Sequence, residues 1–396
     1  NPFTQGVVSS IPTATLTDVE AALISAKHGF EISRNLARYQ RANILAATAA
    51  IVRQELEAFA LLIVSEAGKT IVQARKEVSR CINTLELSAE EAKRLSGEVI
   101  PFDSFEGAMG RQGYTHLDPL GIVLAITPFN DPLNLVAHKL GPAVAAGNSV
   151  ILKPSELAPL SAIKLVDAFV RAGLDQQIIS VVVGDANIGS ALVCADDIRM
   201  VSFTGGMKTG EAITRIAGLK KMTMDLGGNA PVIVMADSDL DKAIAATVSG
   251  AFWASGQNCI GTQRIFIERS VFDKFSADFV AQTQALIVGN PLNEATDVGP
   301  MITPEQSLRI QSWVADAINQ GAMLLTGHQR NDNLYTPTVL TQVPNTAKLC
   351  MQEVFAPVVI LEPFDSFNEV IAWANCVDYS LHAGIFTSDL ETALKA

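Results

Sequence analysis

Residues 121–130 read GIVLAITPFN, a short apolar run that ends in a Thr-Pro turn. A run of this kind predicts a buried strand over residues 122–126. The same rhythm then repeats along the chain, because short apolar runs alternate with segments of helical pattern. The expected strands are 149–152, 179–183 and 200–203, and the expected helices are 133–146, 160–172, 187–193 and 208–217. Such alternation implies right-handed crossovers and a parallel sheet.

The segments on either side of this region have different patterns. A second α/β stretch begins near Pro231, with strands expected at 232–235, 264–268 and 358–361. Residues 16–95 are rich in helix formers, and Thr17 is the expected N-cap of the first helix, with Glu20 completing a capping box. Residues 97–118 are Gly-rich and mix polar with aromatic residues, which predicts an extended arm or hairpin.

Length and composition narrow the class of protein. A chain of 396 residues is too long for one ordinary core and should divide into two or three parts. A net charge of -12 argues against nucleic acid or an anionic membrane surface as the partner. The most apolar stretch, 44–64, is interrupted by Arg53, Glu55 and Glu57, so we expect one packed amphipathic helix there. The start of the chain shows no signal-peptide pattern.

Cysteine and histidine usage indicates the redox compartment and bears on metal binding. The five Cys (81, 194, 259, 350 and 376) form no C-x-x-C pair, which indicates free thiols in a reducing, cytoplasmic compartment. The five His are scattered without ligand spacing, so no metal site is expected.

One cysteine differs from the others in its surroundings. Cys259 lies in G-Q-N-C, 34 residues after Asp225 of D-L-G-G, and Gly and small polar residues are typical of a turn that exposes a sulfur to substrate. An inert core thiol is the alternative for Cys259. Asn130 lies in the turn after the first strand, where its side-chain amide can stabilise an oxyanion or, alternatively, cap the next helix.

Two further turns are candidates for nucleotide binding. Phe203-Thr204-Gly205-Gly206 follows a strand and enters a helix, where free N–H groups favour a diphosphate, although a plain tight turn is the alternative. Lys153-Pro154-Ser155-Glu156 follows another strand, and Lys153 and Glu156 can bind ribose hydroxyls; a solvated loop is the alternative. The sequence contains no G-x-G-x-x-G fingerprint.

These motifs occur in one order and with the spacing of a known family. T-P-F-N, K-P-S-E, F-T-G-G, D-L-G-G-N-A-P, G-Q-N-C-I and E-V-F-A-P (residues 353–357) together resemble the NAD(P)-dependent aldehyde dehydrogenases over nearly the whole chain. The branch most similar in its residues contains the lactaldehyde, phosphonoacetaldehyde and non-phosphorylating glyceraldehyde-3-phosphate dehydrogenases. The resemblance implies an α/β fold with a divergent Rossmann dinucleotide domain, a second α/β catalytic domain and an oligomerisation arm.

The resemblance also implies a role for each matched residue. Cys259 is the expected nucleophile, Asn130 with the Cys259 backbone N–H the oxyanion hole, and Asp225 the base that activates water. The expected NAD contacts, with NADP as a possibility, are Thr127, Pro128, Phe129, Lys153, Ser155, Glu156, Phe203, Thr204, Gly205, Gly206, Leu226, Gly227, Glu353 and Phe355. The expected lining of the substrate tunnel is Asp131, Leu135, His138, Trp253, Asn258 and Ile260. His138 as a packing residue is the alternative.

Three departures from the family pattern bear on the chemistry. Asp225 stands where the family usually has Glu, one methylene longer, and Glu66 and Glu268 are carboxylates that no motif places at the site. Polar tunnel positions favour a small hydrophilic aldehyde, and no Arg flanks Cys259, which favours an uncharged hydroxyaldehyde. The sequence given ends soon after Thr387, where the family continues, and a protein that truly ended there would be expected to have an incomplete tunnel and weak or no turnover.

The expected protein is therefore a cytoplasmic enzyme that oxidises a small polar aldehyde to a carboxylic acid, with Glu156 favouring NAD. Residues 1–100 and 119–228 are expected to form the dinucleotide domain, 101–118 an arm reaching a neighbouring subunit of a homodimer or homotetramer, and 229–396 the catalytic domain. The alternatives are a CoA-acylating dehydrogenase and a catalytically inactive member; esterase activity of the same thiol is a conceivable side reaction. No nucleic acid or membrane partner is expected.

Overall fold

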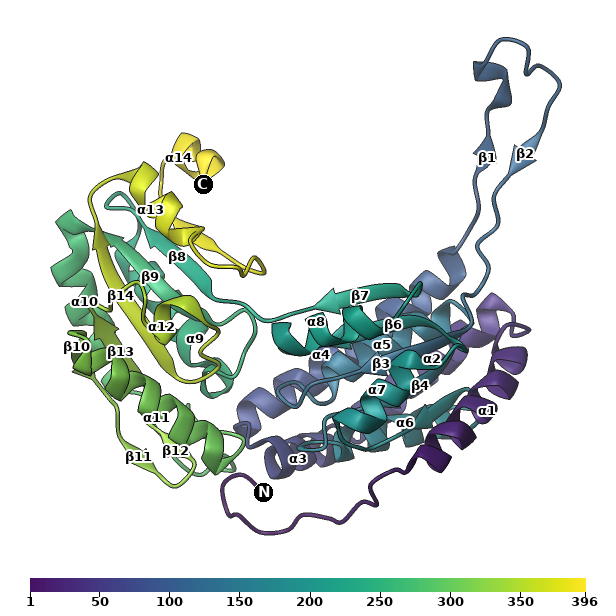
Figure 1. The fold of residues 1–396 in the computed structure, drawn as a ribbon, viewed down its shortest axis with the longest axis horizontal. Coiled ribbons are helices and arrows are strands. Elements are labelled where there is room, and N and C mark those ends of the chain that lie inside the picture. Colours follow the sequence, from purple (N-terminus) through teal and green to yellow (C-terminus); the bar gives the residue numbers. More distant parts are fainter. The chain divides into compact units, whose positions relative to one another are not determined.

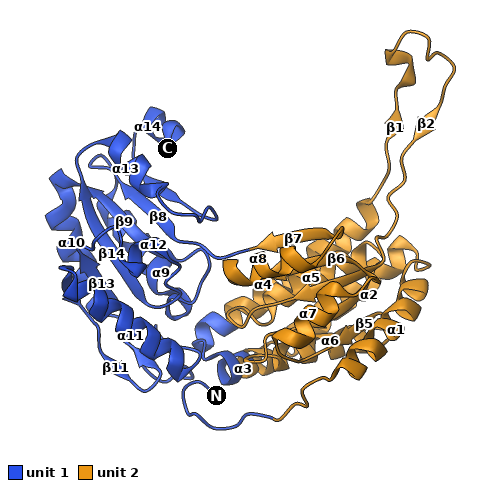
Figure 2. Ribbon diagram, in the orientation of Figure 1, with its two compact units in different colours: residues 1–9, 63–74, 226–396 blue, residues 10–62, 75–225 orange.

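A computed structural model describes residues 1–396, which divide into two compact units (Figure 2). Unit 1 contains residues 1–9, 63–74 and 226–396, and unit 2 contains residues 10–62 and 75–225. The chain passes into the C-terminal unit after Asp225, three residues before the expected boundary. Residues 1–9 and 63–74 also belong to unit 1. One of the contacts that join them to it is the hydrogen bond from Ile71 N to Pro291 O at 2.8 Å.

Unit 2 is built on a five-stranded parallel sheet (Figure 1). Its strands are β3 (Ile122–Ile126), β4 (Ser149–Lys153), β5 (Ile179–Val181), β6 (Ile198–Thr204) and β7 (Lys221–Asp225), in the order β5-β4-β3-β6-β7. The four strands expected from the apolar runs are confirmed. The edge strand β7 was not expected from the sequence, because it is largely exposed and carries no continuous apolar run.

Helices cover both faces of this sheet. The crossover helices α5 (Asn134–Ala145), α6 (Leu160–Arg171), α7 (Ala186–Cys194) and α8 (Met207–Ile216) lie within two residues of the expected bounds. α5 packs on β3 and β4 with α2 (Arg38–Gln54) behind it, whereas α1 (Leu16–Ser33) packs on β4, β5 and α7. Because the strand order reverses between β3 and β6, the carboxyl ends of these two strands flank a topological switch point.

The N-terminal helices are α1, α2, α3 (Leu56–Ala67) and α4 (Ile71–Arg94), so the mostly helical prediction for 16–95 is confirmed. Two details were wrong. The N-cap is Thr15, because its backbone is extended and its side chain forms the capping box with Asp18; Thr17 already lies within the first turn. Residues 44–64 are not one helix, because α2 ends at Gln54. The next residue, Glu55, is its C-cap, and the Glu55 carboxylate binds Lys164 at 2.7 Å and Arg171 at 2.6 Å on α6.

Residues 97–118 form an antiparallel hairpin of β1 (Val99–Ile100) and β2 (Gly113–Tyr114), with the 3-10 turn η1 (Phe102–Ser104) near its tip. Figure 1 shows the hairpin reaching away from the unit 2 sheet. The hairpin prediction is confirmed. Its apolar side chains are exposed, including Val99, Phe105 and Met109. Contact with a neighbouring subunit stays a prediction.

Unit 1 contains a six-stranded sheet in the order β10-β13-β14-β9-β8-β15, parallel except for β10. Its strands are β8 (Ala230–Val234), β9 (Thr262–Glu268), β10 (Met323–Thr326), β13 (Thr338–Thr341), β14 (Val358–Phe364) and β15 (Gly384–Phe386). The strands expected near 232, 264 and 358 are confirmed. A separate hairpin pairs β11 (Arg330–Asn331) with β12 (Leu334–Tyr335).

Alternation along the unit 1 strands divides its core between two faces. Val232, Val234, Ile265 and Ile267 pack with α9 (Leu240–Phe252) and α10 (Arg269–Gln284). Ile233 and Phe266 pack with α13 (Phe367–Ala374), and Ile360 packs with α11 (Pro304–Asn319) and α12 (Lys348–Met351). The 3-10 turn η2 (Trp253–Gly256) follows α9, and α14 (Leu390–Lys395) ends the chain. None of the helices is both long and apolar enough to span a bilayer.

Candidate active site

Cys259 follows a turn with an unusual backbone conformation. After α9 ends at Phe252, Ala254, Ser255 and Gly256 have φ angles of 51°, 57° and 69°. Left-handed backbone costs about 1 kcal/mol or more for a residue with a side chain, so the surrounding structure has to stabilise this turn. Gly256 meets a second requirement, because a Cβ there would overlap the carbonyl oxygen of Ala356.

Two buried hydrogen bonds stabilise the turn. The Ser255 hydroxyl donates to Gly299 O at 2.9 Å, and the Gln257 side-chain oxygen accepts from Ile302 N at 2.9 Å. The Cys259 side chain remains partly exposed. Cys81 and Cys350 are buried instead. Burial raises the pKa of the Cys81 thiol far above its usual range and that of the Cys350 thiol to about 12. Cys259 is therefore not a buried core thiol, and unlike the exposed Cys194 and Cys376 it directly follows a left-handed turn.

Three of the sequence motifs meet at this turn within unit 1. A Cβ on Gly228 would overlap the carbonyl oxygen of Cys259, and a Cβ on Gly227 would overlap the carboxylate of Glu353. Gly228 N donates to Glu353 Oε1 at 3.2 Å. Burial raises the pKa of the Glu353 carboxyl, and the Gly228 N–H and Arg309 oppose that shift. The glycines of D-L-G-G thus allow Cys259 and Glu353 to approach the same backbone.

Side chains that the sequence analysis did not select hold the Glu353 loop. Asn229 Nδ2 donates to Cys350 O at 2.8 Å and to Gln352 O at 3.1 Å. Gln263 Nε2 donates to Gln352 O at 2.8 Å, and its oxygen accepts from Val354 N at 3.0 Å. Both amides are buried, so these bonds fix the loop on each side of Glu353. The Asn229 position in D-L-G-G-N was the only sequence signal for this network.

The unit 2 residues of the prediction lie at one edge of the sheet. Asn130, Lys153, Thr204 and Asp225 follow or end β3, β4, β6 and β7, and parallel strands end at a common edge. Asn130 is buried, and no hydrogen bond engages its side-chain amide. That leaves the amide able to donate to a ligand. Cys259 belongs to unit 1, so the structure describes the two halves of the predicted catalytic set separately.

A buried lysine that the sequence analysis missed connects to Asp225. Lys139 Nζ, on α5, donates to Thr204 Oγ1 at 2.9 Å and to Ser202 Oγ at 3.2 Å. The Thr204 hydroxyl in turn donates to Asp225 Oδ2 at 3.3 Å. Burial lowers the pKa of Lys139 to about 8, although the Asp225 charge opposes the shift. The Thr204 side chain, expected near a pyrophosphate, is therefore engaged between a lysine and a carboxylate.

The groups expected to bind a dinucleotide have a suitable arrangement. α8 begins at Gly206, no side chain caps it, and a Cβ at Gly206 would meet open space, so its first N–H groups are accessible to an anion. Lys153 is buried, and its ammonium group lies 3.4 Å from Glu156 Oε1, whose side chain is half exposed. These residues fit a dinucleotide whose diphosphate meets the α8 terminus and whose ribose meets Lys153 and Glu156.

The predicted substrate residues of unit 2 include a charged cluster. Asp131 Oδ2 accepts from Arg80 Nη1 of α4 at 3.2 Å, and Leu135 N donates to Asp131 O at 3.1 Å. His138 reaches solvent; desolvation by surrounding atoms, followed by the Arg80 charge, lowers its pKa, whereas Asp131 opposes this. Arg80 was missed because only residues next to Cys259 in the sequence were considered as anion ligands. The only sequence signal for Arg80 was its place in the helical pattern, on the face of the helix that meets Asp131.

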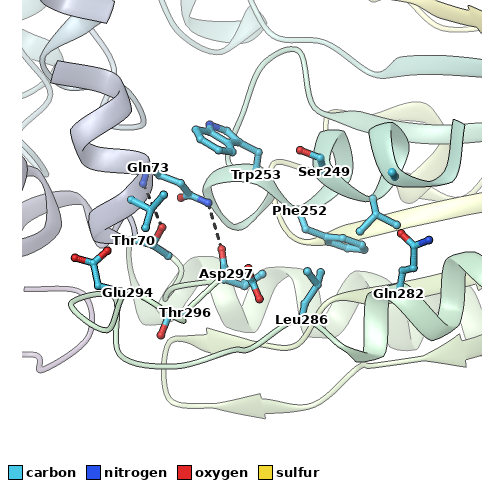
Figure 3. Close-up of a pocket in the computed structure, with 14 residues that line it drawn as sticks. Thr70, Gln73, Ser249, Phe252, Trp253, Gln282, Leu286, Glu294, Thr296 and Asp297 are labelled. Atoms are coloured by element: carbon cyan, nitrogen blue, oxygen red, sulfur yellow. Dashed lines mark hydrogen bonds between the residues drawn. The ribbon is translucent and has the colours of Figure 1, made fainter. Parts of the chain in front are cut away.

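Among the predicted substrate residues of unit 1, Asn258 and Ile260 flank Cys259, and Ile260 is exposed. Trp253 instead lines a cavity of about 360 Å³ beside α9 and α10, shown in Figure 3. Cys259 does not line this cavity, whose walls include Phe252 and Leu286. Of the two carboxylates without a motif, Glu268 accepts from Ala236 N at 2.8 Å and so closes a loop, and Glu66 is buried.

Comparison with known proteins identifies the family to which the chain belongs. The sequence profile of the Aldehyde dehydrogenase family matches residues 1–396, and the chain belongs to this family. It is 55% identical over 396 residues to "Aspartate-semialdehyde dehydrogenase 1" of Pseudomonas canavaninivorans, covering all of this chain and 84% of the relative. It is 43% identical over 397 residues to a 3-sulfolactaldehyde dehydrogenase of Priestia aryabhattai, covering 83% of that protein.

Among solved structures, the chain is similar to glyceraldehyde-3-phosphate dehydrogenase GapN of Methanocaldococcus jannaschii, complexed with NADP, with a TM-score of 0.96 and 40% identity. The match covers all of this chain and 86% of that one. These relatives confirm the predicted family, its branch and its α/β fold. The protein is an NAD(P)-dependent aldehyde dehydrogenase.

Proposed function

We propose that Cys259 is the nucleophile of this enzyme and that the product is the free carboxylic acid. The observation that carries the proposal is the turn at 254–259, which is left-handed over three residues and lies against the D-L-G-G backbone. The Cys259 thiolate attacks the aldehyde carbon, and the side-chain amide of Asn130 donates to the alkoxide that forms. When bound, NAD(P) supplies the hydride acceptor for this oxidation.

The second half-reaction releases the acid from the Cys259 thioester. Asp225 takes a proton from the attacking water, and the resulting hydroxide adds to the thioester carbon while the Cys259 thiolate leaves. The proton then passes to the Thr204 oxygen as the Thr204 hydroxyl proton moves to neutral Lys139. A lysine with a pKa near 8 is suited to this exchange at physiological pH.

We further propose that the predicted cofactor residues bind NAD in preference to NADP. The supporting observation is Glu156, a half-exposed carboxylate whose charge opposes a ribose 2′-phosphate, whereas its partner Lys153 can bind ribose hydroxyls. Glu353 and Phe355 remain the proposed contacts of the nicotinamide ribose. Thr127, Pro128, Phe129, Ser155, Gly205, Leu226 and Gly227 complete the proposed site.

The substrate we propose is a short aldehyde with a polar or charged group near the carbonyl. Aspartate semialdehyde and 3-sulfolactaldehyde, named for the two relatives above, are the first compounds to test. We propose a cytoplasmic location because all five cysteines are free. A homodimer or homotetramer is proposed because the exposed apolar residues of the β1–β2 hairpin need a covering partner.

The test is NADH formation by the purified protein with a panel of short aldehydes, with and without CoA. Cys259→Ala should abolish NADH formation while NAD still binds, as measured by calorimetry. Cys194→Ala, which removes a more exposed free thiol, is the control and should keep its rate. Retained oxidation by the Cys259 variant contradicts the proposed nucleophile, and no NADH from the unaltered protein supports an inactive family member.

One observation favours a second candidate, a CoA-acylating dehydrogenase. Asp225 is one methylene shorter than the usual glutamate, which weakens activation of water and leaves the thioester open to another thiol. A single burst of NADH that only CoA converts into turnover supports this candidate. Turnover that is independent of CoA supports hydrolysis. Ester cleavage without NAD would reveal the side activity of the same thiol.

A further inference from the structure

We propose that Cys376 and Cys350 form a reactive thiol pair, separate from Cys259, which a low-molecular-weight disulfide such as glutathione disulfide oxidises to an intramolecular disulfide. The pair belongs to unit 1, where both residues line one cavity of about 210 Å³. Arg264 and Glu362 are also among the walls of this cavity, and Cys259 does not line it. The proposed oxidation of an aldehyde uses neither of these two thiols.

The first argument is that Cys376 is the thiol that reacts first. Cys376 is exposed in the loop that follows α13, so a dissolved disulfide can reach its sulfur. The buried guanidinium of Arg264 donates from Nη1 to Cys376 Sγ at 3.6 Å. Burial lowers the pKa of Arg264, and the charges of Cys376 and Cys350 oppose this shift. A positive charge beside the sulfur is a feature that activates a cysteine as a nucleophile.

The second argument is that Cys350 has a base in its surroundings. Burial raises the pKa of the Cys350 thiol to about 12, so this thiol needs a group that accepts its proton. Cys350 Sγ donates to Val343 O at 3.9 Å, and Val343 N donates to Glu362 Oε1 at 2.8 Å, so both side chains contact the same residue. Burial raises the pKa of the Glu362 carboxyl to about 7, which suits a general base at neutral pH.

The third argument is that the Cys376 loop is free to move. A disulfide brings its two sulfurs to about 2.05 Å from each other, so the chain has to close part of the cavity that both cysteines line. Residues 377–382, between Cys376 and β15, form no hydrogen bond. Cys350 lies within α12, so closure moves the Cys376 loop rather than the helix.

The chemistry is thiol–disulfide exchange in two steps. The Cys376 thiolate, having lost its proton to solvent, attacks one sulfur of glutathione disulfide and releases a glutathione thiolate, which regains a proton from solvent. Cys350 then attacks the Cys376 sulfur while its proton passes to Glu362. The second glutathione leaves as a thiolate and takes that proton. Two protein thiols are oxidised, and one glutathione disulfide is reduced to two thiols.

The disulfide should loosen the loop that carries Glu353, three residues after Cys350. Cys350 O accepts from Asn229 Nδ2 at 2.8 Å, and Asn229 Oδ1 accepts from Arg264 Nε at 2.6 Å. Both cysteines therefore contact the Asn229–Arg264 pair that fixes this loop. Oxidation removes the Cys376 thiolate from Arg264 and strains the Cys350 backbone. This consequence rests on the proposed function, in which Glu353 contacts the nicotinamide ribose, and it predicts weaker NAD binding.

The test uses the full chain with Cys259→Ala and Cys194→Ala, which leaves three thiols, at Cys81, Cys350 and Cys376. Glutathione disulfide should remove two of these three thiols without adding a glutathionyl group to the intact mass, and dithiothreitol should restore both. Adding Cys350→Ser should stop the reaction at a glutathionyl group on Cys376. Adding Cys376→Ser should prevent the loss of any thiol, because Cys81 is fully buried.

Glu362→Gln should slow the conversion of the mixed disulfide into the intramolecular disulfide about tenfold or more, because the base is lost. Glu268→Gln is the matched control, since Glu268 is a carboxylate of the same sheet that also accepts from a backbone N–H. Its rate of conversion should not change. By calorimetry, the oxidised protein should bind NAD about threefold to tenfold more weakly than the reduced protein. The Cys376→Ser variant should bind NAD equally before and after treatment.

Four results would overturn the proposal. The glutathionyl group could persist on the protein that retains both cysteines, the Cys376→Ser variant could lose thiols equally fast, the disulfide could join two chains on a non-reducing gel, or oxidation could leave NAD affinity unchanged. Failure of the proposed function is distinguishable, because a protein that binds no NAD in either state would still form the disulfide seen by mass. Far-UV circular dichroism of each variant identifies any loss of fold.

Discussion

The ammonium group of Lys139 donates a 2.9 Å hydrogen bond to the Thr204 hydroxyl, which itself donates to Asp225. This arrangement couples a half-buried carboxylate at a sheet edge to a buried lysine whose pKa burial lowers to about 8. The F-T-G-G turn therefore supplies a hydrogen-bonding hydroxyl, that of Thr204, in addition to the glycines that lead into α8. Thr204 joins the proposed base to a group able to accept its proton.

The first prediction concerns pH. Neutral Lys139 is the proposed proton acceptor, and its population rises as pH passes through about 8, so the CoA-independent steady-state rate should rise through the same pH. Lys139→Met and Thr204→Val should each remove this limb. Lys164→Met, a lysine of α6 paired with Glu55, should keep it. An unchanged pH profile in both relay variants would contradict the relay.

The second prediction is that the Lys139 side chain makes the free energy of unfolding increase with pH. Because its folded pKa lies below the ordinary value of 10.5, the unfolded chain binds more protons between about pH 8 and pH 10.5. The cost of burying the charge is fully present below pH 8 and is relieved as pH rises across this range. The free energy of unfolding of the Lys139→Met variant, relative to the unaltered protein, should therefore fall from pH 7 to pH 10. Urea titrations at the two pH values measure this difference.

The Asp225 variants test the base. Asp225→Asn should allow one burst of NADH per Cys259 and then stop, with a thioester visible by intact-protein mass spectrometry. Asp225→Glu should hold or raise the steady-state rate if reach limits hydrolysis. A normal steady-state rate in the Asn variant would remove Asp225 from this role. Asp197→Asn, an acid in an exposed ion pair with Lys27, should change neither phase.

The turn before Cys259 should be sensitive to a single methyl group. Gly256 and Gly218 have similar φ angles of 69° and 66°, but only at Gly256 would a Cβ meet backbone, at Ala356. Gly218→Ala should cost about 1 kcal/mol of unfolding free energy from backbone strain alone. Gly256→Ala should cost about 3 kcal/mol or more and abolish the NADH burst. Equal costs in urea titrations would contradict the close contact.

Cofactor preference should depend on Glu156. Replacing it with Ser removes a charge that repels the 2′-phosphate, so the ratio of kcat/KM for NADP to that for NAD should rise about tenfold. Asp167→Ser on α6, a carboxylate of similar exposure, should leave this ratio unchanged. A fall in NADP use by the Glu156 variant would show that Glu156 does not face the ribose.

Much of the fold follows from local patterns in the sequence. The apolar runs at β3 and β4 predicted these strands because their residues are buried on both faces of a parallel sheet, and the shorter runs at β5 and β6 belong to strands that are only partly buried. The turns after these strands then marked the sheet edge at which Asn130, Lys153 and Thr204 lie. Edge strand β7 gave no such signal, since exposed strands need no apolar run.

The sequence by itself determined the strand–helix alternation, the turn chemistry and the order of the motifs, because each depends on neighbouring residues. Only the tertiary structure decided which distant side chains meet. Arg80 reaches Asp131 because Glu77 and Thr84 bond α4 to α5, and Lys139 reaches Asp225 because Thr204 lies between them. Periodicity specifies the face on which a residue lies, whereas packing of whole elements selects the partner across that face.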